Sequence, residues 1–240
     1  MAEALRIVGL HSPLDHDDFR LEKSKIIKRD RLKNAGRDAG GKPLRTFPHP
    51  VLAGPFDVSV EPGGCLGVMG ASGSGKSLFL RMVADLDPNQ GEAWLGERTR
   101  SGMSGPAWRR LVTYVAAESG WWTDDVADHF EPKHKAAAGD LAQRFGLDAA
   151  LLEAKVARLS TGERQRLALI RALVHAAPVL LLDEPTAALD QDSIGKVEAV
   201  LRERLAAGAI LILVTHDPAQ AERLATQRLN MVSGRLEPVA

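Results

Sequence analysis

Residues 65–77 read CLGVMGASGSGKS, an apolar run of five residues followed at once by a loop rich in glycine and serine. The run is typical of a buried β-strand, and a helical pattern begins at Lys76. Residues 70–77 fit G-x-x-x-x-G-K-[ST] without a gap. Glycine suits such a loop because a Cβ would obstruct the backbone conformations that aim successive N–H groups at phosphate oxygens. Strand, loop and helix together predict a nucleoside triphosphate site.

We expect the whole loop to contact this nucleotide. Lys76 would reach the β and γ phosphates, Ser77 would hold Mg²⁺, and the positive end of the helix would attract the anion. The predicted nucleotide-binding residues of this segment are Gly70, Ala71, Ser72, Gly73, Ser74, Gly75, Lys76, Ser77 and Leu78.

A second apolar run, residues 179–182, leads into two adjacent carboxylates, Asp183 and Glu184. Open α/β sheets bind their ligands at the carboxyl ends of the strands. Asp183 suits coordination of Mg²⁺ through water, and Glu184 is then free to polarise an attacking water as general base. The adjacent acids favour a hydrolytic site over a switch-like or kinase-like one.

A third apolar run, residues 210–214, ends in Thr215-His216-Asp217. His216 would contact the γ phosphate and orient the attacking water there. Alternatively, it caps the helix that starts at Pro218. The sequence of this segment taken alone favours the cap.

Short apolar runs alternate along the chain with segments of helical period, which predicts an α/β fold: a P-loop NTPase core with a mixed sheet flanked by helices. The expected strands are 65–69, 111–116, 179–182 and 210–214, and the expected helices are 76–84, 161–176, 192–206 and 218–225. We expect a small antiparallel layer from residues 4–9 and 56–60, and a closing hairpin from residues 229–238.

Composition excludes several classes of protein. The 240 residues contain 31 Lys+Arg and 31 Asp+Glu, so no overall field attracts nucleic acid or an anionic membrane. The single cysteine, Cys65, cannot form an internal disulfide and is interpreted as a small buried hydrophobe. With no secretory signal pattern at the N-terminus, we expect a cytoplasmic protein. Since no apolar run approaches the roughly 20 residues of a membrane helix, a different chain would span any membrane that it serves.

The segment LSTGERQR, residues 159–166, precedes a long helix and lies upstream of the acidic strand. Here the chain resembles the ATP-binding cassette (ABC) ATPases, whose signature is commonly LSGGQ, with Thr161 and Glu163 replacing the third and fifth residues. The resemblance covers about residues 47–240. Its motifs follow the family's order: phosphate loop, signature, acidic strand, a segment like the D-loop at residues 188–190, and His216 like the switch histidine.

Ser160 and the backbone N–H groups that begin the helix at Thr161 form a second anion site. The resemblance implies that two cassettes dock head to tail, with each ATP between the phosphate loop of one and Ser160, Gly162 and Glu163 of the other. It implies the cofactors ATP and Mg²⁺, and as partners a second ABC ATPase subunit, identical or different, and an integral membrane permease. The permease would hold the chain at the inner face of the cell membrane.

Three further positions bear on the family's pattern, and one of them, Ala117, departs from it. Phe47 lies where an adenine-stacking aromatic is common, but the nearby chain is irregular, so stacking is left open. Ala117 replaces a glutamine that contacts Mg²⁺ in relatives; Glu118 or a water would substitute, and we expect nucleotide binding to persist with altered coupling. Because Trp121 and Trp122 cannot share one face, at least one should lie near the surface, as an interface contact or as a loop cover.

We predict a single ABC ATPase domain over residues 1–240, with a helical subdomain at 118–158 and an irregular basic insertion at 11–46. Residues 20–45 of that insertion hold ten Lys or Arg against three acidic residues, as a solvated segment or as a functional patch. The histidines other than His216 show no metal-ligand spacing.

Two functions follow from this pattern. The first is the ATP-binding and hydrolysing subunit of an ABC transporter; the second is a soluble ABC ATPase that acts on nucleic acid or ribosomes. A single cassette without long inserts favours the first, whereas the missing glutamine and the basic insertion favour the second. A small-molecule kinase explains neither the signature nor the paired acids.

Overall fold

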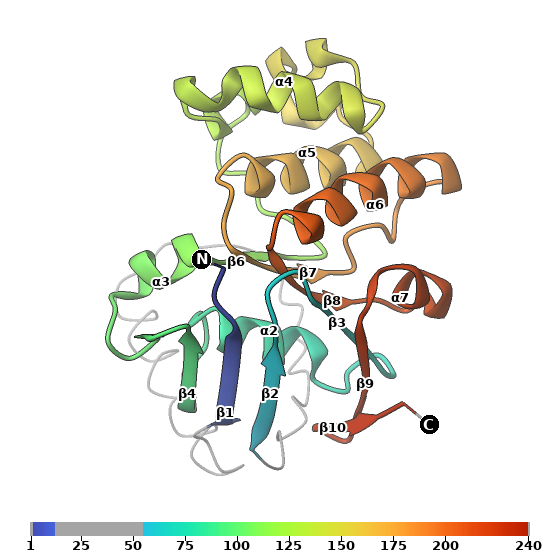
Figure 1. The fold of residues 1–240 in the computed structure, drawn as a ribbon. Helices are drawn as coiled ribbons and strands as arrows, with labels where there is room; N and C mark the ends of the chain where they lie inside the picture. Colours follow the sequence, from blue (N-terminus) through green and yellow to red (C-terminus); the bar gives the residue numbers. More distant parts are fainter. Residues whose placement is uncertain (1, 13–54, 240) are drawn as a thin grey trace, which may run out of the picture.

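A mixed sheet of six strands forms the centre of the molecule, in the order β10-β9-β3-β8-β7-β6 (Figure 1). The computed structural model describes residues 2–12 and 55–239. Neighbouring strands run parallel, except for the antiparallel hairpin of β9 and β10. The predicted α/β fold is confirmed. The strands are β3 (Cys65–Met69), β6 (Val112–Val115), β7 (Val179–Asp183), β8 (Ile210–Val214), β9 (Gln227–Val232) and β10 (Arg235–Pro238).

A smaller antiparallel sheet has the order β2-β1-β4-β5. Its strands are β1 (Leu5–His11), β2 (Phe56–Val60), β4 (Gln90–Leu95) and β5 (Arg98–Thr99). The pairing of β1 with β2 matches the layer expected from the sequence. Strand β4 was not predicted, because only Ala93 and Leu95 of its six residues are buried and its first three are Gln, Gly and Glu.

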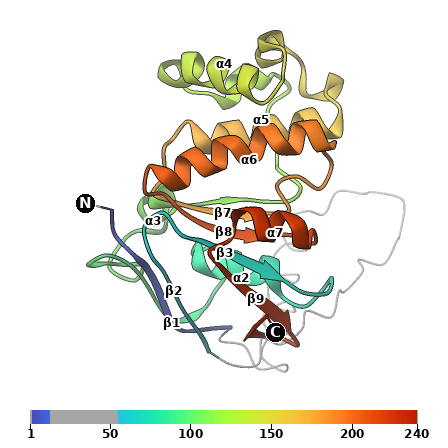
Figure 2. The same cartoon turned by 45° about the vertical axis from the view of Figure 1, so that its right-hand side comes forward.

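Helix α2 (Lys76–Val83) lies between the two sheets (Figure 2). Phe79 of this helix meets Phe56 of β2 edge to face, with ring centroids 5.0 Å apart. Helix α3 (Gly105–Leu111) closes the same core with Trp108, whose indole N–H donates to the carbonyl of Val83 at 2.9 Å. The helix that starts at the phosphate loop is therefore held on both sides by buried apolar side chains.

The opposite face of the large sheet is covered by α5 (Thr161–Leu173), α6 (Gln191–Ala206) and α7 (Pro218–Leu224). In Figure 2, α5 and α6 lie on one side of β7, β8 and β3, and α2 lies on the other. Burial on both faces explains why the strand sequences are nearly unbroken apolar runs. Within this core Cys65 is fully buried, as predicted, and burial raises the pKa of its thiol to about 12.

Short helical elements fill the chain between β6 and α5. They are η1 (Val126–His129), η2 (Pro132–His134), α4 (Lys135–Arg144), η3 (Ala149–Glu153) and η4 (Val156–Arg158). Helix α5 ends at Leu173, before the predicted residue 176, because Ala176 adopts a left-handed conformation (φ 51°) and Pro178 follows. None of the helices in the described ranges combines the length and apolar character of a membrane span.

Candidate nucleotide site

Four parallel strands end at one edge of the large sheet and bring the predicted site residues together there. The phosphate loop follows β3, His216 follows β8 by one residue, Glu184 follows β7, and Ala116 follows β6. Strand β8 lies between β3 and β7, so its end separates the loop from the acidic pair. Motifs more than 100 residues apart in sequence thus meet as expected for strand ends in an open sheet.

The phosphate loop needs its glycines. Gly70, Gly73 and Gly75 have φ angles of 136°, 79° and 107°, in the left-handed region that side chains disfavour. A Cβ at Gly70 would lie 2.4 Å from the carbonyl oxygen of Met231 on β9. Substitution at Gly70 would therefore force the loop away from the neighbouring strand.

Polar groups of the loop are available for an anion. No side chain caps the N-terminus of α2 at Gly75, and the buried Oγ of Ser74 has no hydrogen-bond partner. The ammonium of Lys76 is buried and donates to the carbonyls of Gly70 and Ala71 at 2.8 and 2.9 Å. Burial lowers the pKa of Lys76, opposed by the charges of Glu184 and Asp183. Open N–H groups, an orphaned hydroxyl and a positioned cation fit a bound phosphate.

The rest of the loop surrounds this centre. Ala71, Ser72, Gly73 and Ser77 are exposed to solvent, whereas Leu78 is half-buried against the core. The exposed hydroxyl of Ser77 at the first turn of α2 is accessible to a metal ion.

Asp183 is held by a tyrosine that our sequence interpretation missed. The carboxylate is 4% exposed, and its Oδ2 accepts a hydrogen bond from the phenol of Tyr114 at 3.0 Å. Burial, followed by the charge of Asp183, raises the pKa of Tyr114, so the phenol stays protonated and donates. The sequence signal available was a lone tyrosine on β6, the strand that pairs with β7 in parallel register.

Glu184 and His216 form a pair at the rim of the sheet. Oε1 of Glu184 lies 3.1 Å from Nε2 of His216. Glu184 has a left-handed backbone (φ 49°), fixed by its N–H, which donates to the carbonyl of Val214 at 2.9 Å. Burial raises the pKa of Glu184, while His216 and Lys76 lower it. The carboxylate is thus partly desolvated and close to a proton carrier.

The alternative role of His216 as a helix cap is wrong. The N-cap of α7 is Asp217, whose Oδ1 accepts from the N–H of Ala219 at 2.9 Å. Asp217 performs this role because its side chain is one residue nearer to the helix start. His216 is half-exposed and directed to Glu184 instead.

Gln165 connects the signature helix to the acidic strand. Its side-chain N–H donates to the carbonyl of Glu184 at 2.6 Å, and its Oε1 accepts from the N–H of Ala188 at 3.1 Å. Gln165 lies inside the signature segment, but no pattern in the sequence connects it with residues 184 and 188. The contact makes the backbone position of Glu184 dependent on α5.

Ser160 is the N-cap of α5 and forms a capping box with Glu163. Its Oγ accepts from the N–H of Glu163 at 3.3 Å, and the carboxylate of Glu163 accepts from the N–H of Ser160 at 2.7 Å. These bonds lower the pKa of Glu163. A carboxylate of the same chain therefore lies at the helix end where we expected a phosphate.

Within residues 2–12 and 55–239, no hydrogen bond or ion pair joins Ser160, Gly162 or Glu163 to the phosphate loop. Glu118 is exposed and likewise takes part in no described hydrogen bond or ion pair. Phe47 and nearly all of the basic insertion lie outside the described residues.

A groove beside β6 is lined by Trp122, the second residue of the tryptophan pair. Trp122 is 68% exposed, which confirms that one tryptophan lies at the surface, and Trp121 is half-buried. The guanidinium of Arg171 lies over the rings of Trp121 and Trp122, 4.9 and 4.7 Å from their centroids. The ring of His129 packs against the same two rings. The groove has a volume of about 610 Å³ and includes Trp122, His129 and Arg171 in its lining.

Comparison with known proteins agrees with this geometry. The sequence profile of the ABC transporter family matches residues 54–187. An Fe(3+) ions import ATP-binding protein, FbpC of Mesorhizobium japonicum, is 35% identical over 204 residues, covering 80% of this chain and 56% of the relative. A thiamine import ATP-binding protein, ThiQ of Cereibacter sphaeroides, is 36% identical over 205 residues, covering 78% of this chain and 87% of the relative. This chain thus spans little more than half of the first relative.

Solved structures show the same fold. A bacterial Atm1-family ABC exporter with ATP bound superposes with a TM-score of 0.73 at 19% identity, covering 98% of this chain and 38% of the exporter. A bacterial ABC transporter cassette solved as a dimer gives a TM-score of 0.69 at 21% identity, covering 79% of this chain and 91% of the cassette. Sequence profile, relatives and fold agree, and this chain belongs to the ABC transporter family.

Proposed function

We propose that this chain is the ATP-binding and hydrolysing subunit of an ABC transporter. The observation that carries the proposal is the meeting of Lys76, Asp183, Glu184 and His216 at one edge of the sheet, beside a loop with unpartnered polar atoms. The names of the relatives support transport, and none of them favours the nucleic-acid alternative.

The residues at the strand ends divide the work of hydrolysis. Lys76 and the N–H groups of the loop bind the β and γ phosphates, and Glu184 accepts a proton from the attacking water as general base. His216, 3.1 Å from Glu184, orients that water and contacts the γ phosphate. Because burial raises the pKa of Glu184, its carboxylate is a stronger base than an exposed one.

Ser77 and Asp183 would hold Mg²⁺, with the exposed Glu118 as a third candidate ligand. Hydroxyl and carboxylate oxygens are the donors that this cation prefers. When bound, the metal neutralises phosphate charge. The hydrogen bond from Tyr114 fixes the orientation of Asp183 and leaves Oδ1 free for this purpose.

Two copies would complete each site. Ser160 and Gly162 at the start of α5 make no contact with the phosphate loop of their own chain, so a head-to-tail partner would supply them to the bound ATP. The partner is a second ABC ATPase subunit, identical or different. Glu163 opposes this contact by its charge, and the closed dimer therefore requires the capping box to rearrange.

The second partner is an integral membrane permease, which places this chain at the cytoplasmic face of the cell membrane. The groove beside β6, lined by the exposed Trp122 and by Arg171, supports this assignment, because aromatic and arginine side chains are enriched in protein interfaces. We further propose that residues 1–240 form one ABC ATPase domain, with residues 118–158 as its helical subdomain.

The variant Glu184→Gln tests the hydrolytic function. ATP affinity should stay close to that of the parent, while turnover should fall by about 100-fold or more, because the general base is lost and the shape is kept. Phosphate release measures turnover, and calorimetry measures binding. Glu97→Gln, at an exposed position, is the matched control. Hydrolysis at the parental rate in Glu184→Gln would show that another group is the base.

A further inference from the structure

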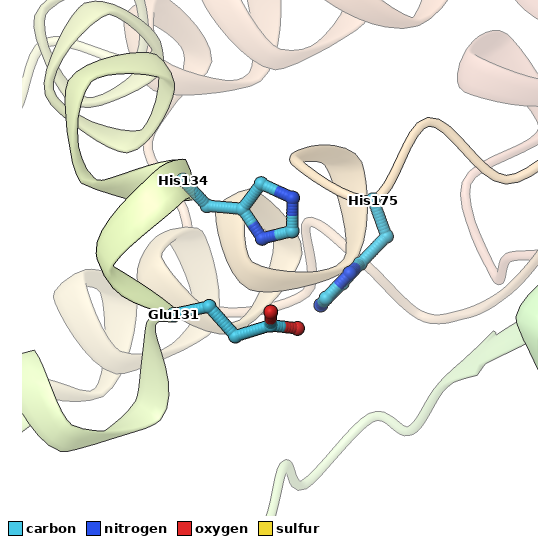
Figure 3. Close-up of side chains that lie close together, drawn as sticks. All are labelled: Glu131, His134 and His175. Carbon is cyan, nitrogen blue, oxygen red and sulfur yellow. The ribbon is translucent and has the colours of Figure 1, made fainter.

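Three side chains with metal-ligand chemistry converge away from the nucleotide site. One ligand atom each from Glu131, His134 and His175 lies within 4.8 Å of the others (Figure 3). Glu131 directly precedes the turn η2, and His134 is its last residue. His175 comes two residues after the end of α5. The histidines are 41 residues apart in sequence, which is why their spacing indicated no metal site.

Among residues 2–12 and 55–239, no hydrogen bond or ion pair with another side chain holds either imidazole in place. Their rings meet edge to face, with centroids 4.7 Å apart. Nδ1 of His134 is inaccessible to solvent and has no hydrogen-bond partner. A buried ring nitrogen without a partner is costly, and a metal ion would satisfy it.

We propose that Glu131, His134 and His175 form a binding site for a divalent transition metal of the zinc class. Two imidazoles with one carboxylate form a known ligand set for Zn²⁺, and a fourth position is left open. Imidazole ligands disfavour Mg²⁺ and Ca²⁺, which take oxygen ligands.

The geometry is close to a coordinated one. Bonds of about 2.0–2.2 Å put the ligands of a tetrahedral ion roughly 3.3–3.6 Å apart. Metal binding would draw the ligand atoms, now within 4.8 Å of one another, closer together by rotation of the side chains. Glu131 and His175 are exposed, so their rotation would not disturb the core, whereas His134 is partly buried.

The C-terminal end of α5 and the ammonium of Lys133 have opposite effects on a cation bound at this site. The C-terminal end of α5, next to His175, attracts a cation through its free carbonyl groups. The ammonium of Lys133 lies 2.9 Å from Oε2 of Glu131 and competes for that carboxylate. The metal must displace Lys133 or bind through Oε1.

The site would connect two parts of the molecule. All three ligands line the groove that also contains Trp122 and His129. A bound ion would tie η2 to the end of α5 and fix the width of that groove. Its binding does not depend on nucleotide, so it can be measured independently of ATP hydrolysis.

The experiment is a zinc titration of the full chain without nucleotide, against a chromophoric chelator. His134→Ala and His175→Ala should each lower the affinity for one equivalent of zinc by at least about tenfold. Lys133→Ala should raise this affinity. His11→Ala, on β1, and Glu153→Gln, an exposed carboxylate of η3, are the matched controls and should bind as the parent does.

Thermal melting supplies a second measurement. Zinc should raise the Tm of the parent and of both controls, and this increase should be lost in Glu131→Gln, which keeps the side-chain shape. Circular dichroism verifies that each variant is folded. Equal zinc affinity and equal Tm increases in the parent and all the ligand variants would overturn the proposal.

Discussion

Tyr114 shows how a single residue supports the site from outside the motifs. Its phenol donates to Asp183 at 3.0 Å in a partly buried position. Tyr114→Phe should lower the free energy of unfolding by about 1–2 kcal/mol, because it leaves a buried carboxylate oxygen without its partner. The less well oriented Asp183 should also increase the Mg²⁺ concentration needed for half-maximal turnover. Urea unfolding and a magnesium titration of ATPase activity measure the two effects.

Thr113→Val is the control on the same strand. The hydroxyl of Thr113 donates to the carbonyl of Arg109 at 3.1 Å and has no contact with Asp183. This variant should change stability but leave the magnesium dependence unchanged. An unaltered magnesium dependence in Tyr114→Phe as well would restrict Tyr114 to a role in stability.

Helix α5 begins with a capping box whose contribution depends on pH. Hydrogen bonds from Ser160 lower the pKa of Glu163 below its ordinary value of 4.5. A lowered folded-state pKa stabilises the protein above the ordinary value, and this stabilisation is lost as the pH falls through the folded-state pKa. Glu163→Gln should therefore be less stable than the parent at pH 7, and the difference should shrink below pH 4.5. Urea midpoints over a pH series measure it.

Glu153→Gln provides the comparison for this series. Its carboxylate has a single ion pair, with Lys135 at 3.8 Å, and 71% of the side chain is exposed. We expect little change in stability at any pH from this substitution. If the difference in stability between Glu163→Gln and the parent stayed constant down to pH 3, the protonation of Glu163 would not be linked to folding.

Helices α6 and α7 are joined by one buried carboxylate. Glu198 is 2% exposed and pairs with Arg202 at 2.8 Å and with Arg223 at 2.7 Å. Glu198→Gln should lower the free energy of unfolding by about 2 kcal/mol, because the charge-assisted hydrogen bonds from Arg202 and Arg223 are weakened, while these two side chains, 47% and 39% exposed, remain solvated. Chemical denaturation checks this value. Glu203→Gln on the same helix removes an exposed pair with Arg144 and should cost about 1 kcal/mol or less.

At the scale of the whole molecule, the proposed head-to-tail arrangement predicts that closure around ATP requires two chains. With Glu184→Gln to prevent turnover, ATP and Mg²⁺ should convert the protein from monomer to dimer in small-angle scattering. Adding Ser160→Arg should prevent the dimer, since a long side chain would block the helix end that meets the partner's nucleotide. Ser59→Arg, on the exposed face of β2, should not prevent it. A dimer that forms equally well with Ser160→Arg would rule out the head-to-tail arrangement.

Helix α5 joins the nucleotide site to the groove. Arg171 of α5 stacks on Trp121 and Trp122, and Gln165 of the same helix holds the backbone of Glu184. Helix α5, and not the segment that precedes it, therefore contacts both regions. This connection gives the proposed permease contact a physical path to the acidic pair.

The local sequence pattern was sufficient to predict those parts of the fold that depend on a single segment of the chain. The buried strands, the phosphate loop and the acidic pair were predicted because apolar runs, glycine spacing and strand-end carboxylates are each readable within about ten residues. Strand β4 was missed because only two of its six residues are buried, which leaves a weak periodic signal. The segment taken alone favoured the wrong role for His216, since Asp217 beside it is the residue that caps α7.

Tertiary structure decided the contacts between distant segments. The hydrogen bond from Tyr114 to Asp183, the bridge of Gln165 to Glu184 and Ala188, and the approach of His175 to Glu131 and His134 join residues 19 to 69 positions apart. No sequence period encodes such pairs, because they arise from which strands lie side by side and where each helix ends. The amino-acid sequence thus determined the chemistry of the phosphate loop. Tertiary packing determined how the side chains around the loop are oriented.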